Sequence, residues 1–284
     1  MAFRFTGFAD EAGPTIEEQI RATQEAGWDG IELRGVAGDT VTSISDDDWA
    51  RTWGALQTAG IRVAGFGSGI ANWAKTIAMD FSADVTELRR AIPRMRQCGT
   101  RLIRIMSYPN VKDNPWPRDR WRDEVIRRIR ELARIAEGEG VILGHENCSG
   151  YGGLGSRETF EILDAVNSPA LKLIFDTGNT TLHDGSREAT WAFYKACRDR
   201  VVHVHIKACK PDPEGKWITC YPDEDEVQRR VLADLKAREF DGWISIEPHM
   251  AAAVHEGKGV SDARAAAGIY VEYARRLGLI VQGL

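Results

Sequence analysis

The sequence lacks the features that mark a disulfide-rich, membrane-spanning or exported protein. Its 284 residues contain only 5 cysteines, an odd number without a CxxC pair, which is typical of reduced thiols rather than of a disulfide framework. No run approaches the roughly 18 consecutive apolar residues that a membrane helix needs. The N-terminus has no basic region followed by an apolar stretch and a cleavage site. We therefore expect a cytoplasmic protein with no membrane partner.

An excess of positive charge is also missing. The chain has 37 Lys+Arg against 42 Asp+Glu, a formal net charge of −5, whereas a nucleic-acid binder needs positive charge to meet phosphates. The arginines between Arg118 and Arg134 alternate with acidic residues, a pattern that predicts a salt-bridged, solvated helix face. We expect no nucleic-acid partner. Hydrophobic residues make up 43% of the chain, enough to support a folded core.

The 28 glycines indicate a structural repeat. Gly27, Gly60, Gly99 and Gly140 each precede a short apolar run, and the segments before them are periodic like helices. Because a helix often ends at a left-handed residue, which glycine adopts without strain, each glycine predicts a junction from helix to strand. Eight strands, each followed by a helical pattern, are predicted at residues 3–8, 28–33, 61–66, 100–105, 141–146, 171–176, 201–206 and 243–247.

Alternating strands and helices predict a parallel sheet of the α/β class, and eight units predict a closed (β/α)8 TIM barrel, with residues 1–284 forming a single domain. An open, doubly wound sheet would place a glycine-rich phosphate loop after the first strand. Residues 9–14 match neither GxGxxG nor GxxxxGK[ST], which counts against that alternative. Long loops are expected at residues 109–117 and 210–225, on the face where barrel active sites are built.

Four side chains suited to metal binding lie at the ends of consecutive predicted strands: Glu146, Asp176, His205 and Glu247. They are each one strand–helix unit apart, so a barrel makes them neighbours on one rim. Carboxylates crowded together repel and raise one another's pKa, and a divalent cation relieves that repulsion. Oxygen and imidazole donors favour one divalent metal ion, Mn²⁺ first, with Mg²⁺ or Co²⁺ as alternatives.

The sequences around these residues carry a family resemblance. Gly-His-Glu-Asn at Glu146, Phe-Asp-Thr-Gly-Asn at Asp176, His-Val-His-Ile-Lys at His205 and Ser-Ile-Glu-Pro-His at Glu247 resemble the xylose-isomerase-like TIM barrels, the sugar phosphate isomerase/epimerase family. The resemblance implies that these four residues bind the metal and that the two glutamates are the catalytic acid and base. It implies an isomerase or epimerase that abstracts a proton next to a carbonyl of a carbohydrate-like substrate, through a metal-stabilised enediolate.

The same chemistry leaves other activities open. Loss of a β-leaving group from the enediolate would make the enzyme a lyase or dehydratase acting on a keto-sugar, inosose or 3-keto-glycoside. An endonuclease IV-like repair enzyme, a member of the same superfamily, needs more histidines than the 6 present. A non-catalytic sugar-binding barrel is a further alternative, and a homo-oligomer is compatible with the sequence.

Six further residues are candidate substrate contacts: Asn179, His203, Lys207, Glu32, Arg104 and His249. Asn179 stands where many relatives have a histidine. Lys207 is expected to share the inward side with His205 and to meet a substrate oxyanion or pair with a rim carboxylate. Glu32 and Arg104 are expected either to contact substrate or to fill the barrel floor with polar groups.

Overall fold

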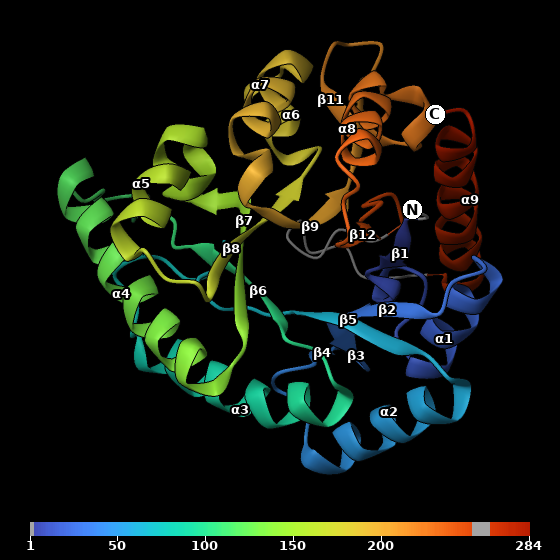
Figure 1. The fold of residues 1–284 in the computed structure, drawn as a ribbon, viewed down its shortest axis with the longest axis horizontal. Coiled ribbons are helices and arrows are strands. Elements are labelled where there is room, and N and C mark those ends of the chain that lie inside the picture. The colour runs from blue at the N-terminus through green and yellow to red at the C-terminus, as the bar shows by residue number, and fades with distance from the viewer. Residues whose placement is uncertain (1–2, 252–261) are drawn as a thin grey trace.

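A barrel of eight parallel strands is the centre of the computed structural model, which describes residues 3–251 and 262–284 (Figure 1). The barrel strands are β1 (Arg4–Gly7), β2 (Gly30–Leu33), β5 (Arg62–Gly67), β6 (Leu102–Ser107), β7 (Ile142–Gly150), β8 (Leu171–Asp176), β9 (Val201–Ile206) and β12 (Trp243–Ile246). Their order is β1-β12-β9-β8-β7-β6-β5-β2. A parallel bridge between Phe8 and Glu32 joins the two ends. The predicted TIM barrel is therefore confirmed.

Helices surround the barrel and cover its outer face (Figure 1). They are α1 (Ile16–Glu25), α2 (Asp46–Ala59), α3 (Ser82–Cys98), α4 (Arg118–Glu139), α5 (Ser156–Val166), α6 (Asn179–Asp184), α7 (Arg187–Cys197), α8 (Glu226–Ala237) and α9 (Ala263–Gln282). Single 3-10 turns are η1 (Ala9–Glu11), η2 (Gly152–Leu154), η3 (Arg198–Arg200) and η4 (Pro222–Glu224). In the described part of the chain, no helix is long and apolar enough to cross a membrane.

Local sequence signals explain where these helices begin and end. The Ser45 hydroxyl accepts a hydrogen bond from the Asp48 N–H and so caps the start of α2. The glycines that follow α2, α3 and α4 have left-handed φ angles of 68°, 74° and 70°. That conformation ends each helix and turns the chain into the next strand, as the glycine repeat predicted.

Helix α4 shows the two faces that its sequence predicts. Val125, Ile129 and Leu132 are buried against the barrel. On the outer face Arg122 pairs with Asp119 and Arg127 with Glu124, with closest N–O distances of 3.0 and 2.7 Å. These pairs neutralise the arginine-rich segment, which confirms the predicted salt-bridged surface.

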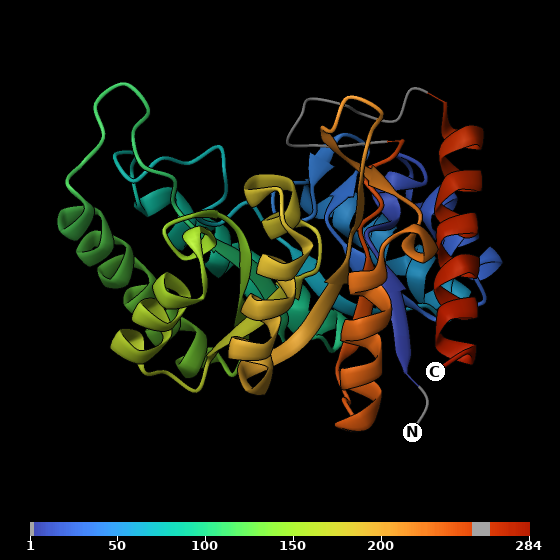
Figure 2. The same ribbon diagram turned by 90° about the horizontal axis from the view of Figure 1, so that it is seen from above.

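The loops that follow the strands gather on one side of the molecule, at the top of Figure 2. Residues 109–117 form a loop there, as expected. Residues 210–225 do not form a plain loop, and this prediction was wrong. They include most of an antiparallel hairpin of β10 (Ala208–Pro211) and β11 (Trp217–Cys220), followed by η4. Four-residue strands beside prolines are too short to show alternation, so the turn residues dominated the sequence pattern. A second short hairpin joins β3 (Gly35–Val36) to β4 (Asp39–Thr40).

Candidate active site and metal centre

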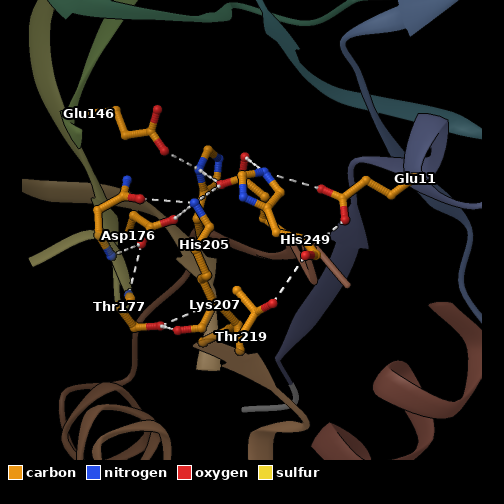
Figure 3. Close-up of polar contacts among 12 residues, drawn as sticks. Glu11, Glu146, Asp176, Thr177, His205, Lys207, Thr219 and His249 are labelled. Atoms are coloured by element: carbon orange, nitrogen blue, oxygen red, sulfur yellow. Dashed lines mark hydrogen bonds and ion pairs between the residues drawn. The ribbon is translucent and has the colours of Figure 1, made fainter. Parts of the chain in front are cut away.

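Four side chains from adjacent barrel strands converge at the loop side of the barrel: Glu146 from β7, Asp176 from β8, His205 from β9 and Glu247, which directly follows β12. One potential ligand atom from each lies within 4.8 Å of all the others. All four residues are at most 3% exposed. Figure 3 shows Glu146, Asp176 and His205 pointing toward one another. The structure thus brings together the four residues that were selected from the ends of the predicted strands.

Three buried carboxylate oxygens in this cluster fit a cation. Among the described residues, Glu146 Oε2, Asp176 Oδ2 and Glu247 Oε2 accept no hydrogen bond, and their polar neighbours are the cationic side chains of Arg104 and Lys207. The other oxygen of Asp176, Oδ1, accepts hydrogen bonds from the backbone N–H groups of Gly178 and Asn179 at 2.8 and 2.7 Å. These bonds fix the orientation of the carboxylate. Burial, together with the charges of Glu247 and Glu146, raises the pKa of Asp176 to about 7 against the opposing effect of Lys207. Buried carboxylate oxygens that accept no hydrogen bond, together with an imidazole nitrogen, form a ligand set that suits Mg²⁺, Mn²⁺ or Co²⁺.

His205 is held between carboxylates on both ring nitrogens. Its Nδ1 lies 2.9 Å from Glu146 Oε1, and its Nε2 lies 3.3 Å from Glu32 Oε1. The second oxygen of Glu32 lies 2.9 Å from His203 Nε2. Burial disfavours the charged ring, but Glu32 and Glu146 outweigh it and raise the pKa of His205 to about 10. Glu32 therefore orients His205 from the side opposite Glu146, as an outer carboxylate does for many metal-binding histidines.

The Lys207 ammonium lies among the carboxylates. Its Nζ is 3.1 Å from Asp176 Oδ2 and 3.0 Å from Glu247 Oε2, and it donates a hydrogen bond to Asn179 Oδ1 at 2.9 Å. The side chain is 2% exposed. Of the two roles that the sequence left open, the ion pair with rim carboxylates is the one that these contacts form.

Arg34 is a site residue that the sequence reasoning missed. Its guanidinium pairs with Asp10, Glu11 and Glu247 at 2.9, 3.2 and 3.0 Å. The same Glu247 oxygen, Oε1, lies 2.9 Å from His249 Nε2. Burial raises the pKa of Glu11 to about 8 although Arg34 opposes the shift. The signal that could have found this cluster was the charge of Asp10, Glu11 and Arg34 at the ends of the first two strands.

A pocket that is open to solvent lies above these residues. Its wall combines site residues with residues of the β2, β5 and β6 ends: Arg34, Thr40, Gly67, Ser68, Gly69, Asn72, Trp73, Arg104, Met106, Glu146, Cys148, Lys207, Glu247 and His249.

The predicted substrate contacts divide into two groups. Arg104, Lys207 and His249 line the pocket, and Arg104 Nη2 donates to the Ser68 carbonyl at 3.1 Å while its Nη1 lies 3.5 Å from Glu146 Oε2. Glu32, His203 and Asn179 are not part of the pocket wall. Glu32 and His203 pair with each other beside His205, and Asn179 binds the Lys207 ammonium.

Similar curated proteins are inosose dehydratases. The one from Lactiplantibacillus plantarum is 27% identical over 151 residues, which cover 48% of this chain and 49% of that protein. The one from Serratia proteamaculans is 27% identical over 154 residues, covering 49% of each chain. This chain therefore matches about half the length of these curated relatives.

Solved structures and a family model agree on the fold. A D-psicose 3-epimerase from Clostridium cellulolyticum H10 with D-tagatose has a TM-score of 0.71 at 14% identity, covering 100% of this chain and 99% of that one. A xylose isomerase-like TIM barrel protein from Mycobacterium smegmatis in complex with magnesium has a TM-score of 0.70 at 14% identity, covering 99% of this chain and 100% of that one. The model of the xylose isomerase-like TIM barrel family matches residues 20–268. The chain belongs to the xylose isomerase-like TIM barrel family.

Proposed function

We propose that this protein is a divalent-metal-dependent isomerase or epimerase that removes a proton next to a carbonyl of a carbohydrate-like substrate. The observation that carries the proposal is the buried cluster of three carboxylates and an imidazole, whose ligand atoms lie within 4.8 Å of one another beneath a pocket. The fold supports it, since a solved structure with the same fold is a D-psicose 3-epimerase with D-tagatose.

In this proposal Glu146, Asp176, His205 and Glu247 hold the metal. When bound by these residues, a divalent cation would supply Lewis-acid chemistry, which would favour proton removal next to a carbonyl. The cation is Mn²⁺, with Mg²⁺ and Co²⁺ as alternatives, and the donor set accepts all three.

The two glutamates are the proposed acid and base. They come from β7 and β12, the outer strands of the arc β7-β8-β9-β12, so they flank the cluster from two sides. Glu146 Oε2 accepts no hydrogen bond in the described chain and has Arg104 Nη1 3.5 Å away, so this carboxylate is held less tightly than that of Glu247, which suits a base. Glu247 is held at Oε1 by Arg34 and His249 and at Oε2 by Lys207. A glutamate on each side allows removal of a proton from one face and its return to the other, which is epimerisation.

Substrate oxygens are proposed to contact the polar groups of the pocket wall, namely Arg104, Lys207 and His249. Asn179 acts on the substrate through the Lys207 ammonium that it binds. Glu32 and His203 are proposed to support His205, because they contact that ring rather than the pocket.

A dehydratase acting on an inosose or another keto-sugar is the second candidate. The curated relatives, which match about half of the chain, are inosose dehydratases, and elimination begins with the same proton removal. The pair of His249 and Glu11 also favours it: His249 lines the pocket, and its Nε2 lies 3.6 Å from Oε1 of Glu11, whose pKa is raised by burial. Such a pair could protonate a departing hydroxyl group.

The test is to incubate the protein loaded with Mn²⁺ in D₂O with ketoses, inososes and 3-keto-glycosides, and to follow the reaction by NMR. Deuterium at a carbon next to the carbonyl is the expected result for the true substrate. A sugar product then identifies an isomerase or epimerase, and an unsaturated or deoxy product identifies a dehydratase. Failure of every compound to exchange would contradict the proposal and favour a sugar-binding barrel.

A further inference from the structure

Lys207 directly contacts two of the proposed metal ligands, Asp176 and Glu247. Its ammonium lies 3.1 Å from Asp176 Oδ2 and 3.0 Å from Glu247 Oε2. In the described ranges these two oxygens accept no hydrogen bond, so the ion pair with Lys207 is the closest polar contact that they make there. Lysine side chains this deeply buried occur almost only in ion pairs. The two carboxylate oxygens that a metal would use are therefore the same two that hold this lysine in place.

A metal ion and the ammonium compete for these oxygens on electrostatic grounds. A divalent cation binds carboxylate oxygens at about 2.0–2.2 Å, closer than an ammonium can approach. Two cations that share two buried oxygens also repel each other strongly where water is scarce. Metal binding must therefore weaken the contacts of Lys207 with Asp176 and Glu247.

The Lys207 ammonium has polar surroundings other than the two carboxylates. Its third contact, Asn179 Oδ1 at 2.9 Å, belongs to neither carboxylate, and the side chain lines the pocket. The Lys207 backbone is fixed, since its N–H donates to Thr177 Oγ1 at 3.0 Å and its carbonyl accepts from Gln228 Nε2 at 3.2 Å. Any adjustment is therefore confined to the flexible side chain.

We propose that Lys207 is a resident counter-ion that competes with the divalent metal for Asp176 and Glu247. Metal binding turns its ammonium toward Asn179 and the pocket, where it becomes a donor for a substrate oxygen. The lysine thus lowers the metal affinity of the site and couples metal arrival to preparation of the substrate pocket. This inference rests on the proposed function, because it requires the cluster to hold a metal.

The test is the affinity for Mn²⁺, measured by isothermal titration calorimetry on protein stripped with a chelator. We expect Lys207→Met to bind Mn²⁺ at least tenfold more tightly than the wild type. Lys207→Gln removes the same charge but keeps a polar group, and the same direction is expected. Lys172→Met is the matched control. It removes a lysine near the start of β8, at the other end of that strand from Asp176, and so leaves the site contacts unchanged. Circular dichroism establishes that each variant is folded.

A second readout comes from thermal unfolding with and without Mn²⁺. Each Lys207 variant removes the ammonium from Asp176 Oδ2 and Glu247 Oε2, so Mn²⁺ should raise its melting temperature by more than it raises that of the wild type. If both folded variants bind Mn²⁺ no more tightly than the wild type, Lys207 does not compete with the metal, and the proposed metal site itself is not contradicted. If neither the wild type nor the variants bind Mn²⁺, the proposed metal-dependent function fails and this inference fails with it.

Discussion

Replacing Arg34 by methionine is a direct test of how the Glu247 carboxylate is held. The Arg34 side chain is 8% exposed and pairs with Asp10, Glu11 and Glu247. Methionine keeps an apolar side chain of similar length but also removes a cation–π contact, because the guanidinium carbon lies 4.4 Å from the centre of the Phe8 ring. It removes a group that contacts all three carboxylates, so the main consequence is that the buried Asp10 and Glu247 carboxylates lose a counter-ion.

The magnitude follows from that burial. Removing one partner of a buried ion pair costs about 3–5 kcal/mol, because the remaining charge stays away from water. For a chain of this size about 2 °C of melting temperature corresponds to 1 kcal/mol, so Arg34→Met should melt about 6–10 °C lower than the wild type. Arg51→Met is the matched control. It breaks the pair of Arg51 and Asp48, whose side chains are 72% and 44% exposed, and should shift melting by less than about 2 °C.

The loss should depend on pH. The pKa of Glu11 is raised from 4.5 to about 8, so the folded protein binds this proton more tightly than the unfolded chain does. The stabilising contribution of that proton is present below about pH 4.5 and is lost as the pH rises through about 8. Without Arg34 a charged Glu11 is still less favourable, so the variant should lose more stability at pH 8 than at pH 5.5. A shift no larger than that of Arg51→Met, or a larger loss at pH 5.5, would refute the reasoning.

Two further substitutions probe positioning residues. Glu32→Gln removes a carboxylate from His205 and His203, and we expect Mn²⁺ affinity to fall about 10- to 100-fold in a folded protein; unchanged affinity by calorimetry would contradict the orienting role. Glu87 accepts hydrogen bonds from the Gly69 N–H and the Thr42 hydroxyl, both at 2.8 Å, and so ties together two loops of the pocket wall. Glu87→Gln should raise KM up to about tenfold and leave kcat nearly unchanged in steady-state kinetics, and a fall in kcat alone would argue against this role.

The site residues that lie at the ends of successive barrel strands were predictable from the sequence. Each strand end is one repeat from the next, so Glu146, Asp176 and His205 could be placed on one rim before any contact was known. Residue parity also placed His203 on the same side as His205. Parity does not give depth along the barrel axis, however. The pairing of His203 with Glu32 therefore appeared only in the structure.

The contacts that the sequence could not predict cross the barrel. Arg34 reaches Glu247, 213 positions later in the chain, and this contact depends on closure between the first and last strands. Lys207 was expected on the inward side, but its choice between a substrate oxygen and a carboxylate depends on side-chain distances of about 3 Å. The β10–β11 hairpin was hidden for a different reason, because its prolines and its turn residues masked two very short strands.

The central claim is that two carboxylates beside a metal move a proton next to a carbonyl. The most direct measurement is the rate of solvent deuterium incorporation into the substrate identified by NMR, compared among the wild type, Glu146→Gln, Glu247→Gln and the exposed control Glu17→Gln. We predict that each active-site variant remains folded and loses about 10²- to 10⁴-fold in exchange rate, whereas Glu17→Gln exchanges like the wild type. Wild-type exchange in either active-site variant would contradict the two-carboxylate account.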